Sequence, residues 1–331
     1  MDRAPESAWD RPLAVLDAPS NLGLRPPADG VVPGVYKLAG ALREHRLLPR
    51  LGAADAGVVV PPRYRPDWDG RRTRNRDAVA RYSARLADRV GALLDAGTFP
   101  VVLGGDCSIL LGGMLALRRR AGSGGRAGLV FLDGHSDFRH PGNSPAVQAV
   151  AGEDLALVCG FGDPLLTDPD GLRPLVRPAD VVVVGVRPDD DALPELRALG
   201  ARVVTSADVA ASGAPSAAVA ARAHLRDRGV DRYWIHVDAD VVDPGLLPAV
   251  DSPAPGGLDL AQLEDVLGGL LGGRLEGSLG APSVGPEAAG LEVTVLDPDL
   301  DEDGEQAARL ADVLAVALRR AAAPRRPRVV A

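Results

Sequence analysis

The chain has 331 residues, of which 46% are hydrophobic and 25% charged, and its formal net charge is −8. This composition suits a globular protein with a large core. The negative balance argues against a nucleic-acid partner, because binding phosphates needs a basic face. Apolar runs stay below the roughly 20 residues that span a bilayer, and residues 1–10 lack a hydrophobic signal core. We therefore expect a single domain over residues 1–331, with flexible tails at about 1–10 and 322–331.

Only two cysteines occur, Cys107 and Cys159, so a disulfide framework is not expected. A reducing compartment fits this cysteine content. Together with the absence of a signal core or a spanning segment, it predicts a cytoplasmic protein without a membrane partner.

Strand-like and helix-like segments alternate along the chain. In order, the pattern predicts strand 13–16, helices 35–45 and 75–96, strand 99–103, helix 108–119, strands 129–132, 181–184 and 202–204, helix 216–228, strand 233–237, helix 260–271, strand 291–296 and helix 305–320. The strands are apolar on both sides, which is typical of a parallel sheet covered by helices on each face. Ligands of such open α/β sheets bind outside the carboxyl ends of the strands.

Two acidic clusters stand at predicted strand ends. Asp133, His135 and Asp137 follow one strand, and Asp238 and Asp240 follow another. Residues i, i+2 and i+4 of an extended chain project to the same side, so each cluster converges. A surface network of ion pairs is the less favoured interpretation, because gathered carboxylates without cations raise one another's pKa and cost stability. The pattern indicates two halves of one site for a pair of divalent cations.

Three motifs then point to a family. Residues 104–108 (GGDCS), 133–138 (DGHSDF) and 236–244 (HVDADVVDP) resemble, in order and spacing, the signatures of the arginase/agmatinase/formimidoylglutamase (ureohydrolase) family. The resemblance continues through residues 255–258 (PGGL) and 290–295 (GLEVTV). It implies a three-layer α/β/α sandwich around a parallel β-sheet, a binuclear manganese site at the strand ends, and a homo-oligomer.

The resemblance also implies the ligands. Asp133 and Asp238 would bridge two Mn²⁺ ions, His135 and Asp240 would complete one site, and Asp137 and the residue at position 107 would complete the other; we take Asp137 and Asp238 as catalytic through the metals. Carboxylates and imidazole suit manganese. Water held between two such ions serves as hydroxide near neutral pH, and it would attack an amidine or guanidine carbon. The products would be an amine plus urea or an amide.

Cys107 departs from the family pattern, because most active members have histidine at this position. A thiolate is softer than imidazole and carries a charge, which makes bound water less acidic. Three alternatives stay open: a preference for Zn²⁺, Fe²⁺ or Co²⁺, a weak first site, or a protonated Cys107 that does not bind. A small buried residue at a strand-to-helix turn is the structural interpretation.

The residues expected around the substrate also depart from the family. The histidine that arginases place after DxHxD aligns with Ala151, and the glutamate that grips the guanidinium aligns with Val295. Glu292 is a substrate-binding candidate, but its separation of three from Val295 points it to the other strand face. Arg139 and His140 form a basic pair that favours an acidic or carboxylate-bearing substrate such as formimidoylglutamate. A solvated loop charge explains this pair equally well.

Three acidic or basic residues near the motifs are expected to act indirectly. Asp243 precedes Pro244, which favours a turn-stabilising role over ligation. Asp106 is expected to be structural. His236 alternates with Asp238 on a strand and is expected behind the ligands.

The sequence thus predicts a metal-dependent hydrolase that cleaves nonpeptide C–N bonds in a linear amidine or guanidine, a small-molecule substrate. One alternative is a specialised amidinohydrolase of secondary metabolism that acts on a modified guanidine. Another is a noncatalytic metal-binding homologue, which the absence of the usual residues at Ala151 and Val295 supports.

Overall fold

A single parallel sheet organises the protein. The computed structural model describes residues 11–122, 125–144, 148–272 and 285–322, and the strands in these ranges form an eight-stranded sheet in the order β2-β1-β3-β8-β7-β4-β5-β6. The strands are β1 (Leu13–Asp17), β2 (Ala54–Val58), β3 (Phe99–Leu103), β4 (Ala127–Leu132), β5 (Val181–Val184), β6 (Arg202–Val204), β7 (Arg232–Asp238) and β8 (Glu287–Thr294). All pairings between neighbouring strands are parallel.

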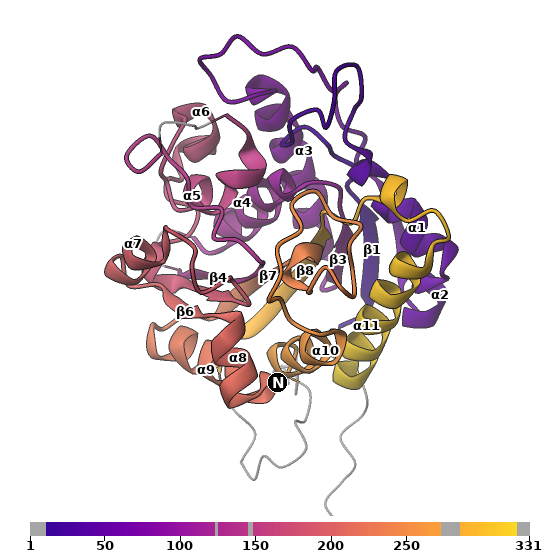
Figure 1. Cartoon of the computed structure of the whole chain (residues 1–331). Coiled ribbons are helices and arrows are strands. Elements are labelled where there is room, and N and C mark those ends of the chain that lie inside the picture. The colour runs from indigo at the N-terminus through magenta and orange to yellow at the C-terminus, as the bar shows by residue number, and fades with distance from the viewer. Residues whose placement is uncertain (1–10, 123–124, 145–147, 273–284, 323–331) are drawn as a thin grey trace, which may run out of the picture.

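Helices cover both faces of the sheet, which gives the three-layer α/β/α arrangement (Figure 1). The helices are α1 (Leu38–Glu44), α2 (Leu47–Leu51), α3 (Arg76–Asp95), α4 (Leu110–Arg120), α5 (Asp154–Val158), α6 (Pro164–Thr167), α7 (Leu193–Ala198), α8 (Ser206–Ser212), α9 (Ala214–Asp227), α10 (Leu260–Leu270) and α11 (Glu305–Ala322). One core contains side chains of α1, α2, α9, α10 and α11, and the other contains those of α3, α4, α5 and α7. None of the described helices combines the length and apolar character that crossing a membrane requires.

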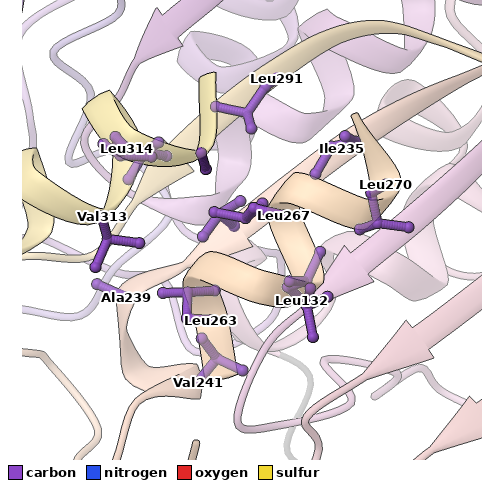
Figure 2. Packing of buried hydrophobic residues seen from close by; sticks show 14 of the residues in the cluster. Leu132, Ile235, Ala239, Val241, Leu263, Leu267, Leu270, Leu291, Val313 and Leu314 are labelled. Carbon is purple, nitrogen blue, oxygen red and sulfur yellow. The ribbon is translucent and has the colours of Figure 1, made fainter. Parts of the chain in front are cut away.

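Alternation along the central strands divides the core into these two layers. On β7, Ile235 belongs to the layer with α10 and α11, whereas Trp234 belongs to the opposite layer. Figure 2 shows Leu267 and Leu270 of α10 on the side of Ile235, and Leu263 of the same helix beside Val241. Each fully buried leucine of this kind contributes roughly 2 kcal/mol to folding. Asp238, the last residue of β7, is separated from Trp234 by an even number of positions and therefore points to the same face of the strand.

The predicted elements are all present, with shifted ends. The strand expected at 291–296 begins at Glu287 and ends at Thr294. Strand β2 was not predicted, because its sequence ADAGV is largely exposed at the sheet edge and has no apolar run. The short helices α2, α5, α6, α7 and α8 were also missed, since a few residues do not establish a helical period. The predicted tails fall largely outside the described residues.

The loops after β1 and β3 pack closely beside the sheet edge that carries the acidic clusters. Asp106 N donates to Ser20 O at 3.0 Å. The Asp106 carboxylate accepts from Gly23 N and, at 2.9 Å, from Ser108 Oγ, which confirms its structural role. A Cβ at Gly105 would lie 1.7 Å from Ser20 O, so this position requires glycine.

Replacing Gly105 by alanine is expected to reduce the free energy of unfolding by about 2–3 kcal/mol, because a backbone atom must move to admit the methyl group. Urea denaturation followed by circular dichroism measures the change. Gly40→Ala is the matched control: Gly40 lies inside helix α1 with no atom near its added Cβ, so the change should stabilise by about 0.5–1 kcal/mol. Equal stability of Gly105→Ala and the wild type would contradict the steric argument.

Candidate metal centre

The sheet order brings the two acidic clusters together. Strands β3, β8, β7 and β4 are consecutive neighbours, so the segments that follow them meet at one edge of the sheet. Cys107 follows β3, Asp133 follows β4, and Asp238 ends β7. Next to them is a cavity of about 360 Å³. Its walls include five of the six predicted ligands, namely Cys107, His135, Asp137, Asp238 and Asp240. The sixth, Asp133, lies behind them with 1% of its surface exposed.

One group that could hold a cation consists of Asp133, His135 and Asp240, whose ligand atoms lie within 4.8 Å of one another. His135 Nδ1 lies 2.9 Å from Asp240 Oδ2. This hydrogen bond raises the pKa of His135. Burial acts to raise the pKa of Asp240, but the hydrogen bond and charge of His135, the amide of Gly134 and the charge of Arg187 together hold it below its usual value. Asp133 Oδ1 accepts from His135 N at 2.6 Å, while its buried Oδ2 has no hydrogen-bond partner. That oxygen is available to a cation.

A second group surrounds Cys107. The ligand atoms of Cys107, Asp137 and Asp154 lie within 4.8 Å of one another, and Cys107 Sγ donates to Asp238 Oδ2 at 2.9 Å. Burial, reinforced by the charge of Asp238, raises the pKa of the Cys107 thiol well above its usual range. The thiol therefore becomes a thiolate ligand only if a cation lies close to the sulfur.

Asp154 lies in this group of side chains, and the sequence analysis missed it. It opens α5 and is fully buried, and neither of its carboxylate oxygens has a hydrogen-bond partner. The only sequence signal was an acidic residue directly before the apolar run LALV. A solvated helix N-terminus gives the same signal, so the sequence did not distinguish the two.

The carboxylates disfavour one another's ionisation. Burial and then the neighbouring carboxylates raise the pKa of Asp133, Asp137 and Asp238 well above the usual value. Divalent cations reverse this effect, because their charge favours the ionised form. Carboxylates, one imidazole and one thiol are a donor set that fits manganese and also tolerates zinc, iron or cobalt. The unpaired oxygen of Asp133 agrees with this fit.

His236 is fully buried next to the predicted ligands and is not part of the cavity wall. Its Nδ1 lies 2.8 Å from Glu292 Oε1, both side chains are fully buried, and Phe131 stacks on the ring. One of the ring nitrogens of His236 lies within 4.8 Å of the ligand atoms of Cys107 and Asp238. The position of Glu292 corrects the expectation that it contacts substrate: this side chain is not part of the cavity wall and bonds His236 instead.

The two basic residues after the DGHSDF motif separate. Arg139 lines the cavity, whereas His140 is buried with Nε2 3.1 Å from Glu195 Oε1 and Nδ1 accepting from Gly142 N. His140 is therefore not a wall residue, which corrects its expected place beside the substrate. Arg25 is a second arginine in the wall that the sequence did not indicate.

Val295 and Ala151 both line the cavity, at the positions where the family resemblance implies glutamate and histidine. Val295 has φ of 72°, a rare conformation for a β-branched residue. Its N–H donates to Gly105 O at 2.7 Å, which holds this turn directly after β8. The cavity thus has apolar side chains at these two positions.

Asp243 has the turn role predicted for it. Its Oδ1 accepts from Gly245 N at 2.9 Å and its Oδ2 from Gly256 N at 2.7 Å. These bonds connect the segment after β7 to residues 255–258, and they leave Asp243 outside the cavity wall.

Comparisons of the sequence and of the fold with known proteins both find arginases. The sequence matches the profile of the Arginase family over residues 36–319. It is similar to an arginase of Bacillus caldovelox, with 31% identity over 253 residues, which are 75% of this chain and 82% of the relative. The fold is similar to the native arginase structure from that organism at pH 5.6, with a TM-score of 0.79, 26% identity and coverage of 93% and 98% of the two chains. It is also similar to proclavaminate amidino hydrolase from Streptomyces clavuligerus, with a TM-score of 0.68, 22% identity and coverage of 94% and 92%.

Glu153 provides a pH test of the cavity wall. Burial raises its pKa to about 7, from an ordinary value of 4.5. Between these pH values the folded chain keeps a proton that the unfolded chain releases, so the free energy of unfolding falls as pH rises through this window, by up to about 3 kcal/mol. Glu153→Gln has no such proton, so its stability relative to the wild type should increase from pH 4.5 to 7 and stay level above.

Urea denaturation of both proteins at fixed metal concentration measures this difference. Glu44→Gln, at an exposed position of α1, controls for the substitution itself. A stability difference between Glu153→Gln and the wild type that does not change with pH would contradict the raised pKa.

Proposed function

Because the chain belongs to the arginase family of metal-binding hydrolases, we propose that it cleaves a nonpeptide C–N bond in a linear amidine or guanidine, using two manganese ions. The observation that carries this proposal is the meeting of Asp133, His135, Asp137, Asp238 and Asp240 beside one cavity. Two bound ions would supply the Lewis acidity that makes water nucleophilic near neutral pH.

The protein's own contribution is to hold and orient these donors. Asp240 N donates to Asp238 Oδ1 at 2.8 Å, and Gly134 N donates to Asp240 Oδ1 at 3.0 Å. Arg187 fixes the same loop from behind, with Nη2 donating to Asp240 O at 3.0 Å. Such bonds keep the carboxylates in one arrangement, which supports tight and geometrically selective metal binding.

The cavity wall supports a substrate with two unlike ends. The carboxylates at the floor favour a cationic amidine or guanidine group. Arg25 and Arg139 are wall residues without an ion pair among the described residues, and they favour a carboxylate elsewhere on the same substrate molecule. Val295 and Ala151 stand in the wall where the family resemblance implies glutamate and histidine. The guanidine or amidine group would therefore be recognised by other contacts than in arginases. We therefore propose a carboxylate-bearing formimidoyl or modified guanidino compound as the substrate class.

A product-release assay tests this function. Manganese-loaded protein is incubated with arginine, its N-hydroxylated and N-acylated derivatives, agmatine and formimidoylglutamate, and urea, hydroxyurea, ammonia and formamide are measured. Metal-dependent turnover of a carboxylate-bearing substrate is expected. Two bound ions without turnover of any amidine or guanidine would instead support the noncatalytic alternative.

Removing a bridging carboxylate is expected to abolish metal binding and turnover together. Asp133→Ala and Asp238→Ala each delete a donor implied for both ions, so elemental analysis after dialysis should find fewer than one manganese ion per chain. Asp243→Ala is the control, because this aspartate bonds backbone amides outside the cavity. Full metal content in both bridging variants would refute the ligand assignment.

Arg139→Ala is expected to raise KM about tenfold or more for carboxylate-bearing substrates with little change in kcat, since the guanidinium would bind the end remote from the reaction. Steady-state kinetics on paired substrates with and without the carboxylate measures the effect. Arg81→Ala, on an exposed position of α3, is the control. Equal loss for both substrates of a pair would exclude a role in carboxylate recognition.

A further inference from the structure

Asp154 stands outside the ligand set that the family resemblance implies, yet it faces the same centre. We propose that Asp154 directly binds the cation beside Cys107 and Asp137, so that a carboxylate from α5 supplies the donor that position 107 provides poorly. This inference rests on the metal-dependent function proposed above. It concerns which residues of this chain hold the ion beside Cys107.

The geometry places Asp154 within reach of a shared cation. Its carboxylate, Cys107 Sγ and a carboxylate oxygen of Asp137 all lie within 4.8 Å of one another. Three donors at such separations can surround one ion with metal–ligand bonds of about 2.0–2.3 Å. They come from three different segments: the loop after β3, the loop after β4, and the start of α5.

Burial makes the free carboxylate informative. Asp154 has no exposed surface, and both of its oxygens lack hydrogen-bond partners. An isolated charge in such a place is strongly unfavourable unless a cation lies next to it. No arginine, lysine or histidine forms an ion pair with Asp154 among the described residues, so this carboxyl stays protonated unless a bound metal ion lets it ionise.

Asp106 shows what a structural aspartate looks like in the same region. It is also fully buried, but its oxygens accept from Gly23 N and Ser108 Oγ. The buried carboxylate of Asp106, which connects two loops, thus has hydrogen-bond donors from the protein. The carboxylate of Asp154 has none and lies next to Cys107 and Asp137.

The chemistry of Cys107 explains why another oxygen donor is useful. Sulfur is a soft donor, whereas manganese prefers oxygen and imidazole ligands. Cys107 Sγ also lies 2.9 Å from Asp238 Oδ2, where it donates rather than offers a lone pair. Asp154 adds a fifth carboxylate to Asp133, Asp137, Asp238 and Asp240, and this additional negative charge strengthens the attraction for two divalent ions.

Asp154→Asn tests the inference with almost no change in shape. Manganese content is measured by elemental analysis after dialysis, and affinity by the loss of the free-ion signal in electron paramagnetic resonance. The expected result is loss of one of the two ions, or at least about tenfold weaker binding of the more weakly held ion. In metal-depleted protein the melting temperature should stay close to that of the wild type, because the substitution exchanges one neutral buried group without protein partners for another of the same shape.

Asp106→Asn is the matched control. It should keep both manganese ions, while its melting temperature falls because the bonds from Gly23 and Ser108 are weakened. Asp154→Ala removes both oxygens and should show the same metal loss as Asp154→Asn, so that residual ligation by the amide oxygen does not hide the effect.

Wild-type manganese content and affinity in both Asp154 variants would overturn the inference. That result leaves the proposed function intact, since Asp133→Ala and Asp238→Ala test it separately. A wild-type protein that binds no divalent metal would overturn both. Metal loss in the Asp154 variants together with a wild-type melting temperature of the metal-depleted Asp154→Asn supports direct ligation.

Discussion

Electrostatic repulsion among buried carboxylates is the constraint on which this site depends. Asp133, Asp137, Asp154, Asp238 and Asp240 gather at one edge of the sheet with few protein cations beside them. The core would gain stability from apolar side chains at these positions. Ionised carboxylates this close together are stable only with positive charge between them, and divalent metal ions have the size and charge to supply it.

The parallel sheet makes this concentration of charge tolerable and ordered. Its central strands are fixed by apolar layers on both faces, so the segments that follow them have little freedom. Glycine at position 105 lets the loops after β1 and β3 approach, and Arg187 bonds the backbone after β7. The carboxylates thus cannot relieve their repulsion by moving apart. The rigid apolar layers on both faces of the sheet thus hold the carboxylates in an arrangement that favours metal binding at the carboxyl ends of the strands.

The sequence indicated which residues gather, but the extended geometry behind that prediction was wrong: the chain bends at residues 134–135, Asp137 has a φ of 42°, and Ala239–Val241 form a 3-10 turn. The apolar strands correctly indicated a covered parallel sheet. The sequence was less informative where position depends on packing from distant segments. Asp154 reaches the centre through the placement of α5, and His140 turns away because Glu195 of α7 binds it. The edge strand β2 has no apolar pattern to detect, since only one side of it is paired.

The contrast between floor and wall suggests which part of the reaction is shared with relatives. The floor retains the carboxylates and the imidazole of His135, but Val295 and Ala151 leave apolar surface where a guanidinium would need polar partners. Val295 adopts a strained backbone conformation to line that wall, so it is held there by its surroundings rather than by its own preference. An apolar contact fits a substituent on the guanidine or the flat edge of a formimidoyl group better than it fits a bare, fully hydrated guanidinium. In the proposed function, Arg25 and Arg139 would select the molecules whose reactive carbon meets the carboxylates, so specificity and chemistry would depend on different residues of the same cavity.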